Sequence, residues 1–377
     1  MRSKTHGIPA DPAELMHSIL QRIATGPELS KNLSREETAA GMRCVLEGSV
    51  DPVQAGVFLI ALRMKRETDD ENCGILDAIR VATKRVTAPV DEVVDIGDPY
   101  DGYNRNLPAS PFLPPLLAAC GVAAVSHGVE RMGPKYGVTH RQVLHAAGVP
   151  VDLSPEDAAA RLGDPALGWT YIDQRAFCPR LHDLTALRTL IVKRPAITTA
   201  EVLAGPIVGG KKTHLVTGYV HKPYPRIYAL LARAAGFDSA LLVRGVEGGV
   251  IPSLAQNGRV FRYVDGGEEQ AVDFKPVELG IEQTVRAPPI PDSAAAVAED
   301  DEEGAAPLDT AVVAQAAAEA GIAALGGARG ATHDCLVYGA ALCLWHLGHH
   351  PSLGAAAKAV HAVLASGEGL RRLRGGR

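Results

Sequence analysis

The chain has 377 residues, of which 46% are hydrophobic and 21% charged, and its formal net charge is −5 at pH 7. This is an ordinary soluble composition, long enough for a large core and two domains, and its charge gives no overall reason to expect a polyanionic partner. Six scattered cysteines without a CxxC pair indicate reduced thiols rather than disulfides or zinc ligands. With neither a signal-peptide core nor a membrane-spanning run, the sequence predicts a cytoplasmic protein without a membrane partner.

Residues 12–86 have a helical pattern throughout and predict a small all-helical N-terminal domain. Ser34 followed by Glu37 is a capping box at the start of one helix. Asp51 followed by Pro52 is typical of another helix start, because proline fits the first helical position.

From residue 90 the pattern changes to strands that alternate with helices. This alternation predicts an α/β domain over 90–377 with a mainly parallel central sheet and helices on both faces. The expected strands are 92–97, 121–128, 213–220 and 239–246, and the clearest expected helices are 111–121, 140–148, 225–236 and an Ala-rich stretch from 310 to 366. Pro, Ala and an acidic run predict a flexible, solvated loop at 286–308.

The stretch DIGDPYDGYNRNLPASPF, residues 95–112, follows the first expected strand. Ligands of parallel sheets bind at the carboxyl ends of the strands, so this loop is a candidate site for a phosphate or phosphosugar. The alternative is a plain turn, because the same residue types favour turns. The candidate phosphate-binding residues are Gly97, Asp98, Asp101, Gly102, Asn104, Asn106 and Ser110.

Two other strand ends carry candidate ligand-binding side chains. His127 in the SHG run offers an imidazole to a ligand, or is a polar residue at a sheet edge. Glu247 in RGVEGGVIPS accepts hydrogen bonds, holds a metal-bound water, or caps its turn.

Long stretches of the chain resemble anthranilate phosphoribosyltransferase. LSREETAAGMRCVLEGSVDPVQAGVFLIALRMKRET is similar to its N-terminal helical domain, and CLVYGAALCLWHLGHHPSLGAAAKAVHAVLASG is similar to its C-terminal helices. DIGDPYDGYNRN stands where the family has Gly-Thr-Gly-Gly-Asp-Gly, and SHGVE where it has Lys-His-Gly-Asn-Arg. The resemblance implies a helical domain that also takes in residues near 178–205, an α/β domain, and a homodimer formed through the helical domains.

The resemblance also implies site residues. In the family the glycine loop holds the pyrophosphate of phosphoribosyl pyrophosphate (PRPP), and His127, Gly128 and Arg194 of this chain match residues on the acceptor side. The family's magnesium-binding Asp-Glu pair falls on Val250 and Ile251, which leaves Glu247 as the one nearby carboxylate to assist magnesium.

Further departures in the loop, Pro99 and Tyr100 in place of small residues, set this chain apart from the biosynthetic enzyme. We therefore interpret it as a divergent paralogue. Anthranilate itself is a poor candidate for the acceptor, because a diphosphate leaving group needs metal neutralisation.

Two functions remain open from the sequence. One is pentosyl transfer from PRPP to an unidentified nitrogen acceptor. The alternative is a non-catalytic protein that binds nucleic acid, such as DNA, in a basic interdomain groove. Scattered solvated charges would produce the same pattern. The candidate groove residues are Arg175, Arg180, Arg188, Lys193, Lys211, Lys212, Lys222 and Arg226.

A metal site in the HLGHH run is a third, weaker hypothesis. His346 and His350 are one helical turn apart, with His349 between them, but histidines at a helix end before Pro351 more often cap carbonyls. The sequence therefore assigns no metal ligand.

Overall fold

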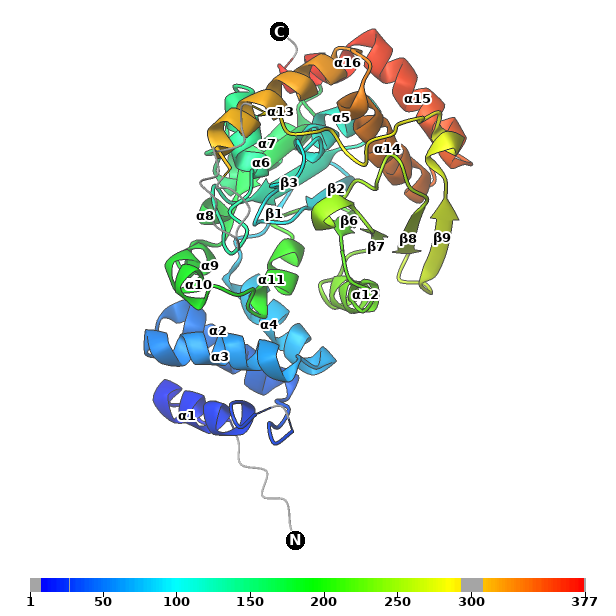
Figure 1. Ribbon diagram of the computed structural model, residues 1–377. Coiled ribbons are helices and arrows are strands. Elements are labelled where there is room, and N and C mark those ends of the chain that lie inside the picture. Colours follow the sequence, from blue (N-terminus) through cyan, green and yellow to red (C-terminus); the bar gives the residue numbers. More distant parts are fainter. Residues whose placement is uncertain (1–7, 27, 293–307, 376–377) are drawn as a thin grey trace.

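The computed structural model describes residues 8–26, 28–292 and 308–375, and it consists of a helical domain and a larger α/β domain (Figure 1). This is the fold class that the sequence predicts. Most of the predicted acidic loop, 293–307, lies outside the described residues. No helix in the described ranges combines the length and the apolar character that crossing a membrane requires.

Two of the N-terminal helices begin at the capping residues that the sequence predicts. Ser34 accepts a hydrogen bond from the Glu37 amide while the Glu37 side chain accepts one from the Ser34 amide. The Asp51 side chain accepts from the amide of Val53, with Pro52 at the first helical position. The four helices are α1 (Pro12–Ile23), α2 (Arg35–Glu47), α3 (Pro52–Lys65) and α4 (Asp69–Ala82).

A middle segment of the chain returns to these helices. Its elements are α8 (Gln174–Phe177), α9 (Pro179–His182), α10 (Thr185–Ile191), α11 (Ile197–Ala200) and the short 3-10 helix η2 (Glu201–Leu203). Helix α9 contacts α2 and α4, α10 contacts α3, and α11 contacts α4 (Figure 1). Arg188 and Glu201 join α10 to η2 through two hydrogen bonds of 2.6 and 2.8 Å, and both side chains are 1% exposed.

The central sheet has seven strands in the order β4-β3-β2-β6-β7-β8-β9. The first five strands are parallel, whereas β8 pairs antiparallel with β7 and β9 pairs antiparallel with β8. The sequence analysis did not predict β4, β8 or β9. The strands are β2 (Glu92–Gly97), β3 (Ala124–Gly128), β4 (Trp169–Asp173), β6 (Lys212–Gly218), β7 (Ser239–Val243), β8 (Gly258–Tyr263) and β9 (Gln270–Phe274). A separate parallel pair joins β1 (Val86–Thr87) to β5 (Ile207–Val208).

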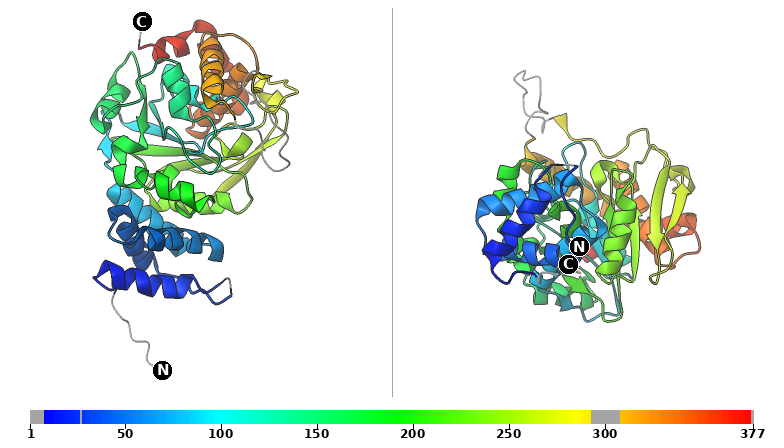
Figure 2. Two further views of the ribbon diagram at one scale, coloured as in Figure 1. Left: turned by 60° about the vertical axis from the view of Figure 1, so that its left-hand side comes forward. Right: turned by 90° about the horizontal axis from the view of Figure 1, so that it is seen from below.

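Successive residues of each strand enter the cores on opposite faces of the sheet. Val93 and Leu215 belong to the core shared with the helical domain and α12 (Tyr224–Ala234). Val94 and Val216 belong to the core under the C-terminal helices, which lie on the face away from the helical domain (Figures 1 and 2). The remaining helices are α5 (Leu113–Ala119), α6 (His140–Ala146), α7 (Pro155–Gly163), α13 (Thr310–Leu325), α14 (Ala331–His346), α15 (Leu353–Ser366) and α16 (Glu368–Leu373).

The buried Arg188–Glu201 pair yields a stability prediction. In Arg188→Met the Glu201 carboxylate stays buried without its partner, so we expect the free energy of unfolding to fall by about 3–5 kcal/mol. The matched control is Arg180→Met, because Arg180 is 59% exposed and its contact with Glu47 is 3.6 Å long; we expect a change within about 0.5 kcal/mol. Urea denaturation measures both, and equally small losses would contradict the structural role of Arg188.

Candidate functional site

Three chain segments meet at the carboxyl edge of the parallel strands. They are loop 98–110 after β2, segment 129–139 after β3, and turn 244–252 after β7. Contacts between the side chains and backbone of these segments hold them together. This is the edge at which parallel sheets bind ligands, so we take it as the candidate site.

Asp98 is the centre of a buried polar cluster at this edge. Its carboxylate accepts hydrogen bonds from the Tyr103 hydroxyl (2.6 Å), the Ser110 hydroxyl (2.6 Å) and the backbone amide of Val250 (3.0 Å), and it lies 2.7 Å from His140 Nε2. Burial by itself raises the pKa of Asp98, but His140 and the hydroxyl donors outweigh it and hold that pKa below its ordinary value. Asp98 therefore connects loop 98–110 to turn 244–252 as an ionised group.

Glu247 connects the same two segments in the opposite sense, because its carboxylate belongs to turn 244–252 and its backbone donors to loop 98–110. Its two carboxylate oxygens accept hydrogen bonds from the backbone amides of Arg105 (2.8 Å) and Asn104 (3.1 Å). The Lys135 ammonium group donates to the same carboxylate at 3.2 Å. Two backbone amides of the predicted phosphate-binding loop, one of them from the predicted residue Asn104, thus donate to a carboxylate of the protein itself.

The loop glycines allow segments of the chain to approach one another. A Cβ atom at Gly97 would lie 2.6 Å from the carbonyl oxygen of Val202, and one at Gly102 (φ +73°) would lie 2.6 Å from the Gly137 backbone. At Gly249 a Cβ atom would overlap the Tyr103 hydroxyl. These glycines are explained by packing within the protein, whatever ligand the loop holds.

Asp101 and Arg194, which the sequence assigns to the phosphate and acceptor sides, are brought into contact. The Arg194 guanidinium donates two hydrogen bonds, of 2.5 and 3.1 Å, to one carboxylate oxygen of Asp101. Lys135 lies 3.9 Å from the other oxygen. The predicted loop residue Asn106 is buried instead, and its side-chain amide donates to the Leu107 carbonyl.

His127 requires a correction. Its ring is 1% exposed, with Nδ1 2.5 Å from the Tyr100 hydroxyl and Nε2 2.7 Å from Asp95. Both ring nitrogens are therefore engaged in the core beneath the loop and do not face an acceptor. Gly128, the next residue of the strand, is also buried. Tyr100, which stands where the resemblance implies a small residue, supplies the contact to Nδ1.

The predicted basic interdomain groove is also corrected. Lys211 and Lys212 lie at the amino end of β6, opposite the candidate site, and pair with Asp91 and Asp265. Arg188 is buried, as described above. Arg226 pairs with Asp69, and Arg180 with Glu47, on the helical domain, while Lys193 is exposed beyond α10.

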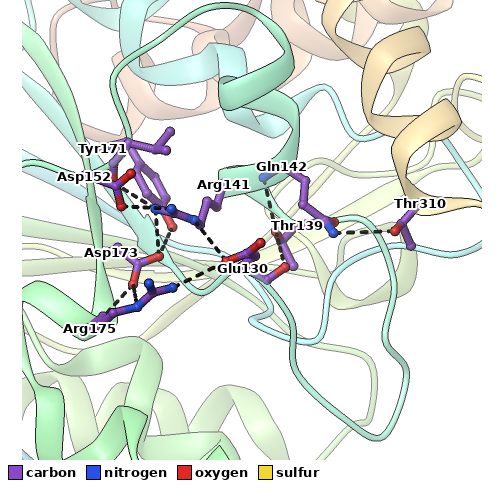
Figure 3. A network of polar contacts seen from close by, with 10 residues as sticks. Glu130, Thr139, Arg141, Gln142, Asp152, Tyr171, Asp173, Arg175 and Thr310 are labelled. Carbon is purple, nitrogen blue, oxygen red and sulfur yellow. Dashed lines mark hydrogen bonds and ion pairs between the residues drawn. The ribbon is translucent and has the colours of Figure 1, made fainter.

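Arg175 belongs to a different network, beside the ends of β3 and β4. It contacts Glu130 at 3.4 Å and Asp173 at 3.9 Å (Figure 3). Arg141 contacts the same two carboxylates, and also Asp152 at 2.8 Å (Figure 3). The network ties these strand ends together and satisfies the charge of Arg175 locally.

The structure does contain a basic groove, and this groove borders the candidate site. It has a volume of about 1320 Å³ and runs from loop 98–110 and turn 244–252 to β8 and β9. Only Lys222 of the predicted groove residues lines it. Sequence reasoning missed the rest because they are scattered over almost 200 positions without a basic run. The cations of the groove are Arg105, Lys222, Arg244, Arg259, Lys275 and Arg286.

The donor set of the site does not fit magnesium, which prefers free oxygen ligands. Val250 and Ile251, at the positions of the family's carboxylate pair, are buried apolar residues. Asp98 and Glu247 already accept hydrogen bonds on both of their oxygens. Over the ranges that the structure describes, no three His, Cys, Asp or Glu side chains are grouped to hold a metal.

The HLGHH histidines are likewise separated. His346 is buried at the end of α14 with Nε2 2.8 Å from the Ser239 hydroxyl, and the same hydroxyl lies 2.8 Å from His214 Nδ1. His349 is exposed on the following turn. His346 and His214 are therefore two buried histidines joined through one serine.

Comparison with known proteins identifies the family. Residues 17–82 match the helical bundle domain of the glycosyl transferase family, and residues 101–370, more than half of the chain, match its a/b domain. The chain belongs to glycosyl transferase family 3. The family resemblance predicted from the sequence is confirmed.

Similar proteins are found both by sequence and by structure. An uncharacterized protein of Aquifex aeolicus is 30% identical over 241 residues, 63% of this chain and 71% of that protein. The anthranilate phosphoribosyltransferase of Methylocella silvestris is 28% identical over 275 residues, 73% of this chain and 75% of that enzyme. The Saccharomyces cerevisiae anthranilate phosphoribosyltransferase, solved in complex with PRPP and Mg, has a TM-score of 0.72 at 15% identity, with 98% of both chains covered. At that identity the structural likeness shows the fold.

The buried histidines of this family member predict a dependence of stability on pH. Burial lowers the pKa of His346 from 6.5 to about 3, and also lowers the pKa of His214. Below pH 6.5 the unfolded chain binds protons that the folded chain excludes, so stability is lost as the pH falls from 6.5 towards 3. In His346→Gln we expect the slope of unfolding free energy against pH to shrink by up to about 1.4 kcal/mol per pH unit, one proton's worth. Denaturant titrations across this window measure the slope, and an unchanged slope would refute the assignment.

Proposed function

We propose that this member of glycosyl transferase family 3 binds nucleic acid through its phosphates, in the groove between turn 244–252 and strands β8 and β9. One observation carries the proposal. Five of the six groove cations have no carboxylate within 4 Å among the described residues, and all five are exposed. The sixth, Arg259, pairs with Asp273. Exposed cations along one groove are the arrangement that neutralises successive phosphates of a polymer.

The remaining charges of the groove support the same proposal. Its carboxylates are Glu247, Asp273 and Glu278. Glu247 is engaged by two amides and Lys135, and Asp273 by Arg259. The local excess of positive charge therefore persists although the whole chain carries −5. Local potential, rather than net charge, governs the approach of a polyanion over a Debye length of about 8 Å.

Pentosyl transfer from PRPP to an unidentified nitrogen acceptor is the second candidate. It is supported by the family, by the yeast relative solved with PRPP and Mg, and by the position of Asp101, Gly102 and Arg194 beside one another at the strand ends. Against it stand the apolar pair Val250 and Ile251, because the charge of a diphosphate leaving group would have to be neutralised without them.

We further propose that two copies associate through the helical domain, as the family resemblance implies. Helices α3 and α10 expose large apolar side chains there: Val53 is 74% exposed, Met64 73% and Leu190 80%. Apolar side chains gathered on one domain are typical of a protein interface.

The proposed groove predicts which cations contribute to the affinity for nucleic acid. In the triple variant Arg244→Ala, Lys275→Ala, Arg286→Ala we expect the affinity for a labelled single-stranded oligonucleotide to fall by about tenfold or more. The slope of log affinity against log salt should fall by up to about 2, because each lost contact with a single strand removes about 0.7. Fluorescence anisotropy at several salt concentrations measures both quantities.

The matched control is Lys211→Ala, Lys212→Ala, which removes two exposed cations from the opposite edge of the sheet. We expect its affinity and salt slope to equal those of the unchanged protein. If this control loses more affinity than the triple variant, the groove assignment is wrong.

For the second candidate, calorimetric titration with PRPP in the presence and absence of magnesium is the test. Because the donor set does not fit magnesium, we expect the PRPP affinity to be the same in both titrations, within about twofold. Affinity that rises by more than about tenfold with magnesium would instead favour family-type chemistry.

A further inference from the structure

The Glu247 carboxylate lies among donors that are suited to hold a bound anion. Two consecutive backbone amides, those of Asn104 and Arg105, and the Lys135 ammonium converge on its carboxylate. Its side chain is only 7% exposed. Consecutive amides beside a cation form the kind of concavity that binds phosphate oxygens as well as carboxylates.

The backbone of Glu247 is held in an unusual conformation to reach these donors. Its φ is +54° and its ψ +17°, a left-handed conformation that a residue with a Cβ atom seldom adopts. Gly245, Gly248 and Gly249 surround it. Movement of Glu247 out of this conformation would relieve the backbone strain, and the nearby glycines give the turn the conformational freedom to allow it.

The charges nearby are balanced only while Glu247 is present. Lys135 and Arg194 face Asp101 and Glu247, two cations against two carboxylates. Withdrawal of Glu247 leaves one positive charge in excess beside two unpaired amide donors. Arg105 and Glu247 both line the basic groove, so a phosphate drawn into the groove arrives at this point.

We infer that Glu247 is an internal competitor for phosphate. A phosphate group of the ligand displaces the carboxylate, takes the hydrogen bonds of the Asn104 and Arg105 amides, and is neutralised by Lys135. Displacement releases one of the two connections between loop 98–110 and turn 244–252, while the bond from the Val250 amide to Asp98 keeps the other. The inference rests on the proposed function only in that the groove delivers the phosphate.

Inorganic pyrophosphate is the probe, titrated calorimetrically into the full chain. In Glu247→Ala the amides are vacant, and we expect the affinity for pyrophosphate to rise by about tenfold or more. Glu247→Gln keeps an acceptor over the amides without its charge, so an intermediate affinity is expected. Glu156→Ala, which removes an exposed carboxylate on α7, should leave the affinity unchanged.

Hydrogen exchange provides the structural readout. The Asn104 and Arg105 amides should exchange faster in Glu247→Ala than in the unchanged protein, and pyrophosphate should restore their protection. Glu247→Gly, which also relieves the left-handed strain, repeats the test if the alanine variant folds poorly. Unchanged or weaker pyrophosphate affinity in both variants would overturn the inference. Undiminished oligonucleotide affinity in the groove variants would overturn the proposed function separately, because pyrophosphate titration involves no polymer.

Discussion

The candidate site depends on a reciprocal pair of contacts between carboxylates and backbone amides. Asp98 of loop 98–110 accepts from the Val250 amide of turn 244–252, and Glu247 of that turn accepts from two amides of the loop. Asp98 satisfies buried donors that would otherwise be left unpaired at considerable cost in free energy. These contacts join the ends of β2 and β7 directly.

Other features of the site follow from this junction. Tyr103 reaches Asp98 only because Gly249 leaves room for its hydroxyl. Tyr100 is buried beneath the loop, where its hydroxyl contacts the buried His127 ring. Val250 and Ile251 are buried and belong to the apolar core under the C-terminal helices. The fold is that of a transferase, while the edge of its sheet is filled by the protein's own side chains.

The distribution of charge follows from the topology. The antiparallel strands β8 and β9 extend the sheet beyond β7, and residues from far apart in the chain meet along their groove. Most cations of the predicted interdomain groove are satisfied locally, as Arg188 is by Glu201 and Arg175 by Asp173 and Glu130. A cation that already has a carboxylate partner contributes little to the field that a ligand meets.

The sequence by itself determined the helical domain, its caps at Ser34 and Asp51, and four of the five parallel strands of the sheet, because capping and hydrophobic periodicity are local properties. It also determined the family, and through that resemblance it predicted that Val250 and Ile251 stand in place of a carboxylate pair. Only the tertiary structure decided that Glu247 lies on the amides of Asn104 and Arg105, since these partners are more than 140 positions apart. The groove likewise exists only after folding, because charges scattered along a chain make a binding surface only where the packing of strands brings them together.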